Sequence, residues 1–335
     1  MSYDLLNYKK YNIKLLTVIF NKNKTDLNVQ LINNVRIINK SRLNIKLKKI
    51  KINDITSRHN YLLNALISKL NFDILKINNV VPSPIVINNV KNKYALLIGI
   101  NYTETSNELY GCINDVMSIN DKLISNGFSD ITIMTDLTPK KATKQNILYE
   151  FETILKKAKS GDSLVLLFSG HGTYTRDNNG DEINNYDQCI VSCDFNIITD
   201  DDLKNTITKY LKPDVSLLAI FDSCFSGSVL DLRYSYMDGN NYDTLIINNK
   251  EIETISSVIM ISGCTDNQTS ADALMDNRPN GAMTWSLLET LKKYPICSWR
   301  ELLINMRILL KASNFTQIPL ISTGQFSNID CNHFF

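Results

Sequence analysis

The sequence predicts an α/β fold with a mostly parallel sheet flanked by helices, preceded by a small β-rich N-terminal region. From Tyr94 onward, short and nearly unbroken apolar runs alternate with amphipathic segments, as a sheet covered on both faces requires. Residues 11–52 instead alternate apolar and polar side chains between Asn- and Lys-rich turns, which is typical of short antiparallel strands. The length of 335 residues allows one large α/β domain and a smaller region.

These patterns divide the chain into a basic N-terminal region at 1–77, a linker at 78–93 and a main domain at 94–335. A short helix is predicted from residue 57 to about residue 70, and Pro82 and Pro84 mark the linker. The main domain divides further into a first part at 94–231, a connecting loop at 232–257 and a last part at 258–335.

Six apolar runs are predicted strands of the main domain: 94–100, 131–134, 164–168, 189–191, 217–221 and 258–262. Two predicted helices between them bury one face each, namely Ile113, Val116, Asn120 and Leu123, then Ile147, Phe151, Ile154 and Leu155. Gly127 is expected to end the first of these helices. A capping box, Ser298-Trp-Arg-Glu301, opens a helix that is expected to bury Leu302, Leu303, Met306, Leu309 and Leu310.

The net charge of +2 conceals a strong asymmetry along the chain. Residues 1–93 carry 17 Lys and Arg against 4 Asp and Glu, whereas the remainder carries 19 against 30. Docking of the basic region onto the acidic remainder is therefore favoured, and nucleic-acid binding by the basic region is the less favoured alternative.

Composition also indicates the cellular compartment and the solubility of the protein. No run approaches the roughly 18 to 20 apolar residues of a membrane helix, and the seven cysteines are odd in number and scattered, as reduced thiols are. We therefore expect a soluble, intracellular and cytoplasmic monomer that does not bind membranes.

Two apolar runs end on reactive side chains, because His171 follows 163–168 and Cys224 follows 216–221. Sites in open parallel sheets form at the carboxyl ends of strands, and a thiol beside an imidazole becomes a strong nucleophile. Nearby glycines let the backbone amides of Gly172 and Cys224 face a developing oxyanion. The alternative is a loop histidine and a small buried cysteine without catalytic function.

Several ordered motifs within about residues 94–327 resemble type I metacaspases: Gly111-Cys-Ile-Asn-Asp115, Ser169-Gly-His-Gly172, Asp222-Ser-Cys-Phe-Ser-Gly227, Ser262-Gly-Cys-Thr-Asp-Asn-Gln-Thr-Ser-Ala-Asp272, Gly281-Ala-Met-Thr-Trp-Ser286 and Thr316-Gln-Ile-Pro319. The resemblance implies a caspase-like fold whose large-subunit-like part is 94–231 and whose small-subunit-like part is 258–335. It also implies an endopeptidase with Cys224 as nucleophile, forming an acyl-enzyme, and His171 as general acid and base.

The same resemblance implies peptide substrates with Arg or Lys before the scissile bond, bound by Cys112, Asp115, Ser169 and Asp222. It further implies calcium (Ca²⁺) dependence, with Asp187, Asp200, Asp201 and Asp231 at the ion. Buried carboxylates are costly without a cation, and hard oxygen ligands suit calcium. The alternatives are structural: Asp115 begins a helix, Asp222 caps a turn, and 200–202 is a solvated helix N-terminus.

The chain departs from the family pattern at Phe225, where these enzymes usually have a histidine. A catalytically weak pseudoprotease that acts as a protein-binding module is therefore an alternative function. The charge asymmetry also suggests a zymogen in which the basic region covers the acidic cleft until calcium binds or the chain is cut, for instance after Lys91, Lys93 or Lys250.

Overall fold

The computed structural model divides the chain into two compact units, Met1–Ile87 and Asn88–Phe335. The structure describes residues 3–41, 44–53, 55–57, 59, 60, 63, 70, 74, 92–177, 180, 185–236, 245–248, 250–263, 272–275, 278–327 and 329. The predicted linker at 78–93 lies almost wholly outside the described residues, as do positions 264–271 of the motif that begins at Ser262.

The described residues of the N-terminal unit are almost all helical, so the predicted strands at 11–52 are wrong. Helix α1 covers Tyr3–Lys40, and Asn44 then caps a second helical stretch at 45–53 by accepting a hydrogen bond of 2.9 Å from the Leu47 N–H. The chain has no Pro or Gly before residue 82, so the two residues that most disfavour helices are absent from this part of the sequence. Its less exposed residues follow the helical period rather than alternation: Leu27, Leu31, Val35 and Ile38.

The described helices include none that combines the length and the apolar character needed to cross a membrane.

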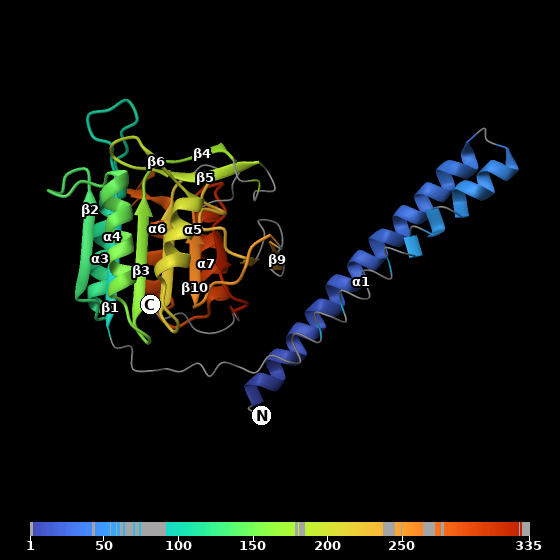
Figure 1. The fold of residues 1–335 in the computed structure, drawn as a ribbon, viewed down its shortest axis with the longest axis horizontal. Helices are drawn as coiled ribbons and strands as arrows, with labels where there is room; N and C mark the ends of the chain where they lie inside the picture. The colour runs from blue at the N-terminus through green and yellow to red at the C-terminus, as the bar shows by residue number, and fades with distance from the viewer. Residues whose placement is uncertain are drawn as a thin grey trace. The chain divides into compact units, whose positions relative to one another are not determined.

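The second unit is organised around an eight-stranded sheet with the order β2-β1-β3-β7-β10-β13-β8-β9 (Figure 1). Its first five strands are parallel and confirm the five main predicted runs: β2 (Asp130–Thr135), β1 (Lys93–Gly99), β3 (Ser163–Ser169), β7 (Ser216–Asp222) and β10 (Val258–Ser262). Three antiparallel strands complete the sheet: β13 (Leu320–Thr323), β8 (Tyr234–Tyr236) and β9 (Leu245–Ile247). Strands β8 and β9 lie within the segment that the sequence predicts as a connecting loop.

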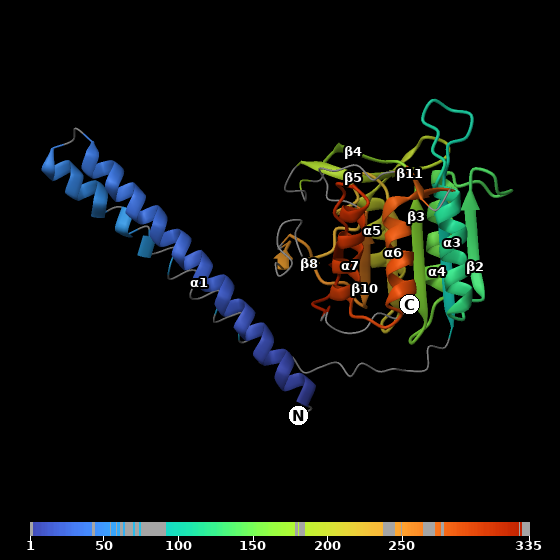
Figure 2. The same ribbon diagram turned by 180° about the vertical axis from the view of Figure 1, so that it is seen from behind.

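Helices cover both faces of the sheet, as the near-continuous apolar strands require. One face packs against α4 (Lys144–Lys157) and α5 (Asp200–Tyr210), which lie in front of the sheet in Figure 1. The opposite face packs against α3 (Cys112–Ser125), α6 (Ala282–Lys293) and α7 (Trp299–Ala312), which lie in front in Figure 2. The predicted α/β architecture is confirmed.

Local signals at the helix ends are also confirmed. Gly127 has a φ of 82° just after α3, where a left-handed residue ends the helix. The capping box of Ser298 and Glu301 opens α7, whose predicted apolar residues are buried except Leu309, which is half-buried.

A small antiparallel sheet lies at the carboxyl edge of the main sheet (Figure 1). It consists of β4 (Gly172–Arg176), β5 (Tyr186–Val191) and β6 (Ile197–Thr199). The predicted run at 189–191 therefore forms a strand, but not one of the main sheet. A hairpin of β11 (Asp272–Met275) and β12 (Arg278–Gly281) leads directly into α6.

Candidate active site

The carboxyl ends of β3 and β7 bring the segments of His171 and Cys224 together. Ser169 and Asp222 are partners in the parallel ladder, and the Gly170 N–H donates to the Asp222 carbonyl over 3.3 Å. His171 and Cys224 each follow two residues later. A Cβ atom at Gly172 would overlap the Cys224 carbonyl oxygen and lie 2.9 Å from its carbonyl carbon, so the two backbones are in direct contact. Cys224 as a whole residue is partly exposed.

The imidazole of His171 is oriented by a backbone carbonyl. Its Nε2 lies 2.7 Å from the carbonyl oxygen of Asn107, in the loop after β1. A carbonyl oxygen only accepts hydrogen bonds, so Nε2 carries the proton of the neutral ring and Nδ1 remains the basic nitrogen. Asn107 could not be identified from the sequence, because a carbonyl contact across 64 positions of sequence leaves no signal in side-chain identity.

Phe225, the departure from the family pattern, adopts the left-handed conformation with a φ of 53°. This conformation is uncommon for a residue with a Cβ atom and indicates a tight turn just after Cys224. Its ring contacts Tyr174 of β4 edge-to-face, with 5.2 Å between the ring centroids. Phe225 therefore joins the cysteine loop to the small sheet by aromatic packing.

Three of the four predicted substrate-binding residues converge. The Asp115 carboxylate accepts hydrogen bonds from the Ser169 hydroxyl at 2.7 Å and from the Gly281 N–H at 2.9 Å, while Asp222 accepts from the Thr284 N–H at 2.8 Å. The fourth residue, Cys112, is buried one turn before Asp115 on α3.

Both carboxylates lie next to Gly281. A Cβ atom at this position would lie 2.6 Å from Asp115 Oδ2 and closer still to Asp222 Oδ2. Asp115 and Asp222 are 1% and 4% exposed, so two carboxylates lie close to the same point in a nearly water-free part of the protein. The N-terminus of α6 compensates part of their charge, because helix N-termini carry partial positive charge. Two negative charges there still favour a cation.

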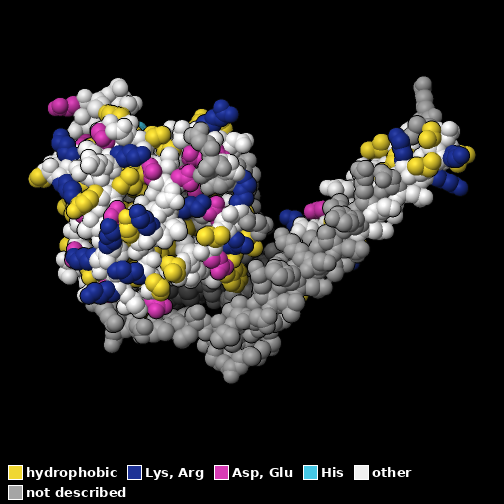
Figure 3. All heavy atoms as spheres, viewed as in Figure 1, with side chains coloured by type: hydrophobic (Ala, Val, Ile, Leu, Met, Phe, Trp, Pro, Cys, Tyr) yellow, Lys and Arg dark blue, Asp and Glu magenta, His cyan; other side chains and the backbone are white. Residues whose placement is uncertain are grey.

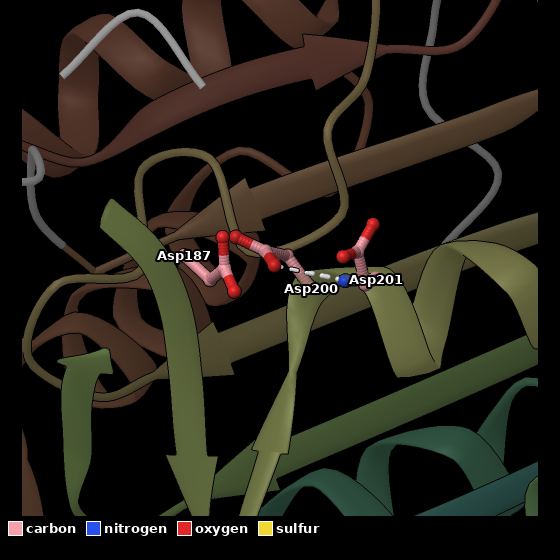
Figure 4. Close-up of side chains that lie close together, drawn as sticks. All are labelled: Asp187, Asp200 and Asp201. Atoms are coloured by element: carbon pink, nitrogen blue, oxygen red, sulfur yellow. Dashed lines mark hydrogen bonds between the residues drawn. The ribbon is translucent and has the colours of Figure 1, made fainter. Parts of the chain in front are cut away.

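A second acidic group consists of Asp187 on β5 with Asp200 and Asp201 in the first turn of α5. One carboxylate oxygen from each lies within 4.8 Å of the others, and Figure 4 shows the carboxylates of Asp187 and Asp200 facing one another. Asp200 accepts hydrogen bonds from the Gln188 N–H at 2.6 Å and the Asp201 N–H at 2.8 Å, which fixes its carboxylate. Three of the four predicted metal ligands thus lie together.

The remaining predicted ligand, Asp231, is outside this close group. Its Oδ2 lies 3.6 Å from Nζ of Lys204, and the same ammonium lies 2.6 Å from Glu251 Oε2. Lys204 stands on α5, one turn after Asp200. The structure therefore gives Asp231 an internal cation as a partner, an arrangement that the sequence does not indicate.

Cys189 is buried beside the second acidic group but remains a neutral thiol. Its pKa is raised to about 12, first by burial and then by the negative charges of Asp200 and Asp187. A thiol that stays protonated does not compete as a soft metal ligand. The group therefore presents oxygen atoms, which suit a hard cation.

Comparison with known proteins identifies the family. A family model described as "Metacaspase, peptidase C14 domain" matches residues 93–233. Metacaspase-1 of Meyerozyma guilliermondii is 35% identical over 285 residues, which cover 69% of each chain. Metacaspase-1A of Neurospora crassa is 34% identical over 289 residues, covering 70% of this chain and 63% of that protein.

The fold has a counterpart among solved structures. The crystal structure of protein GSU0716 from Geobacter sulfurreducens matches with a TM-score of 0.53 and 24% identity, covering 71% of this chain and 95% of that one. Identity at this level supports the fold alone. Taken with the curated relatives, of which the chain spans about two thirds, the comparisons show that this chain belongs to the metacaspases, a family of cysteine-type peptidases.

Proposed function

We propose that this metacaspase is a calcium-dependent endopeptidase that cleaves after Arg or Lys, with Cys224 as the nucleophile and His171 as the general acid and base. The main observation in support of this catalytic dyad is the contact between His171 Nε2 and the Asn107 carbonyl oxygen, which are 2.7 Å apart. This contact leaves Nδ1 as the base. The backbone contact between Gly172 and Cys224 supports a thiol within reach of this ring.

In the proposed reaction, His171 takes the proton of the Cys224 thiol and leaves a thiolate. The sulfur attacks the substrate carbonyl carbon, and the backbone amides of Gly172 and Cys224 stabilise the resulting oxyanion. His171 then donates its proton to the leaving amine as the C–N bond breaks, giving a thioester. Water, deprotonated by His171, attacks this acyl-enzyme, releases the acid and restores the thiol.

Specificity for a basic residue is supported by the Asp115 and Asp222 pair. Both carboxylates are almost fully buried, and a guanidinium or ammonium group would neutralise them there. The Ser169 hydroxyl and the backbone N–H groups at the start of α6 keep their oxygens oriented. An aspartate side chain in the same pocket would be repelled.

Calcium binding is supported by the oxygen atoms of Asp187, Asp200 and Asp201, with Asp231 joining them if it leaves Lys204. A bound calcium ion would supply structural order rather than chemistry. Asp187 lies on β5, opposite Thr175 of β4, and β4 begins at Gly172. Fixing β5 would therefore also fix the strand that begins beside the dyad.

Peptides ending in Arg, Lys or Asp before an aminocoumarin group test this proposal, each with and without millimolar calcium. We expect calcium to increase turnover of the Arg and Lys peptides, no turnover of the Asp peptide and no turnover by Cys224→Ala. Equal turnover of all three peptides would refute the specificity, and full activity in a chelator would refute the calcium dependence.

The N-terminal unit is proposed to restrain the enzyme through its charge, as in a zymogen. The 17 basic residues within 1–93 support this, although Lys, Arg, Asp and Glu are interspersed on the face of the second unit shown in Figure 3 rather than grouped by sign. In the full-length protein, replacing Lys46, Lys48 and Lys49 by Glu should raise basal activity. Unchanged basal activity in the charge-reversed protein would argue against an electrostatic restraint.

A binding function without catalysis is the second candidate, and Phe225 beside Cys224 is the observation that favours it. If the protein acts only by binding, Cys224→Ala will leave its cellular function intact. Reaction of Cys224 with a peptide chloromethyl ketone at neutral pH would instead show a competent dyad.

A further inference from the structure

His171 and Val191 form an interrupted pair at the end of the small sheet. Strands β4 and β5 are antiparallel with Gly172 opposite Ile190, so His171 is opposite Val191 one step further on. A hydrogen-bonded pair in such a ladder normally exchanges two N–H···O bonds. Here only one is direct, from the Val191 N–H to the His171 carbonyl at 3.0 Å.

The hydroxyl of Tyr102 occupies the place of the second bond. The His171 N–H donates to this hydroxyl over 2.9 Å, and the hydroxyl donates to the Val191 carbonyl over 2.6 Å. The aromatic ring of the same residue lies against the imidazole, with 4.6 Å between centroids and a tilt of 39°. One side chain therefore contacts both the backbone and the ring of His171.

The surroundings of Tyr102 hold it in this position. Its φ is 51°, and the flanking N–H groups of Asn101 and Thr103 both donate to the Asp136 carboxylate, at 3.3 and 3.0 Å. Gly170 leaves room for the hydroxyl, because a Cβ atom there would lie 2.9 Å from it. The loop that carries Tyr102 also carries Asn107, the partner of Nε2.

The hydroxyl is a permanent donor and acceptor. Burial raises the pKa of Tyr102 well above its ordinary value, a backbone hydrogen bond from His171 opposes this, and the nearby Cys112, Asp136 and Cys193 raise it further. The group therefore keeps its proton over the whole range in which a cysteine peptidase works.

We infer that Tyr102 is a positioning residue for the peptidase reaction: its hydroxyl, inserted between His171 and Val191, and its ring hold the imidazole with Nε2 on Asn107 and Nδ1 available to the thiol. Without the hydroxyl, the ladder would close by a direct His171–Val191 bond and move the ring, or leave two partly buried polar groups unpaired. This inference rests on the proposed dyad of Cys224 and His171, but not on calcium or on Arg specificity.

Tyr102→Phe in the full-length protein tests the inference, and Tyr236→Phe is a matched control. The Tyr236 hydroxyl is also buried between one backbone donor and one acceptor, the N–H and carbonyl of Ser327 at 3.0 and 2.8 Å, but it belongs to β8. With an Arg-aminocoumarin peptide, we expect Tyr102→Phe to lower kcat about tenfold or more with little change in KM. The reason is that one buried hydrogen bond contributes on the order of 1 kcal/mol, and about 1.4 kcal/mol in the activation free energy corresponds to a tenfold change in rate.

Alkylation of Cys224 by iodoacetamide, followed over pH by mass spectrometry of its peptide, gives a second readout that needs no substrate. In Tyr102→Phe the reaction should begin at higher pH, because a displaced imidazole stabilises the thiolate less. Gly170→Ala, whose new Cβ atom would crowd both the Tyr102 hydroxyl and the Phe168 ring at 2.9 Å, should shift the profile the same way. Wild-type profiles in both variants, or an equal loss of kcat in Tyr236→Phe, would overturn the inference.

Discussion

The two acidic groups of the second unit both stand at a helix N-terminus, but they are built differently. Asp115 and Asp222 come from α3 and β7 and approach the start of α6 from outside, around the Cα atom of Gly281. Asp187, Asp200 and Asp201 instead involve the helix itself, because two of the three form the first turn of α5. Their closest oxygens are within 4.8 Å of one another.

This difference indicates what each group can bind. In the first group the carboxylates are oriented by directed hydrogen bonds from a hydroxyl and two backbone N–H groups, which suits a planar, hydrogen-bonding cation such as guanidinium. In the second group oxygen atoms converge on a point, which suits a spherical ion. Substitutions in one group should therefore leave the other property intact.

Asp222→Asn should have the largest effect. It keeps an oxygen for the Thr284 N–H but removes one charge of the buried pair, and losing one partner of a buried charged contact costs about 2–5 kcal/mol. We expect kcat/KM for an Arg peptide to fall by roughly a hundredfold or more. The calcium-induced rise in Tm should persist. If the variant keeps the wild-type kcat/KM for the Arg peptide, the Asp222 carboxylate does not determine the specificity for Arg.

Gly281→Ala should have the next effect, because it changes no charge. The new Cβ atom would overlap the space of both carboxylates, and overpacking of this kind costs about 1–3 kcal/mol. Steady-state kinetics should show about a tenfold loss in kcat/KM for Arg and Lys peptides. Alkylation of Cys224 should proceed at the wild-type rate, and slower alkylation would show that the change reaches the dyad instead of the pocket.

Asp200→Asn should abolish the calcium-induced rise in Tm while leaving the preference for Arg over Asp peptides. Binding to the folded state alone stabilises it, so loss of binding removes the shift. Asp202→Asn is the matched control, since Asp202 lies in the same turn but pairs with Lys144 at 2.7 Å and caps the helix. Equal loss of the calcium shift in both variants would mean that α5, rather than the cluster, is affected.

Lys204→Met should have the smallest effect on function, and it distinguishes a four-carboxylate site from a three-carboxylate site. Without the ammonium, Asp231 and Glu251 lose their cation, so Tm should fall in a chelator and the calcium concentration at half-saturation should fall about two- to fivefold. Tm measured over a calcium titration gives both numbers. An unchanged calcium dependence would exclude Asp231 from the ion site.

Much of the second unit could be predicted from sequence because its signals are local. Buried parallel strands appear as continuous apolar runs in the sequence. The capping box that begins at Ser298 can be recognised from four consecutive residues. The location of His171 and Cys224 at one edge of the sheet could also be predicted, because each follows a predicted parallel strand and sites form at the carboxyl ends of such strands.

The N-terminal unit and the supporting contacts of the site could not be predicted in the same way. Alternation at 11–52 competes with a helical period in the same residues, and the absence of Pro and Gly favours the helix that forms. The partners of the reactive residues are distant in sequence: Asn107 acts through a carbonyl, and Glu251 meets Lys204 only through tertiary packing.

The direct backbone contact between Gly172 and Cys224 has a genetic consequence. Neither reactive group belongs to Gly172, yet any side chain there must separate the two loops that carry them. A variant in which alanine replaces this glycine would look conservative to anyone comparing residue types, but it should behave as a loss-of-function allele. The severity of a substitution at residue 172 is set by the narrow space between two main chains, and not by the chemical difference between the two side chains.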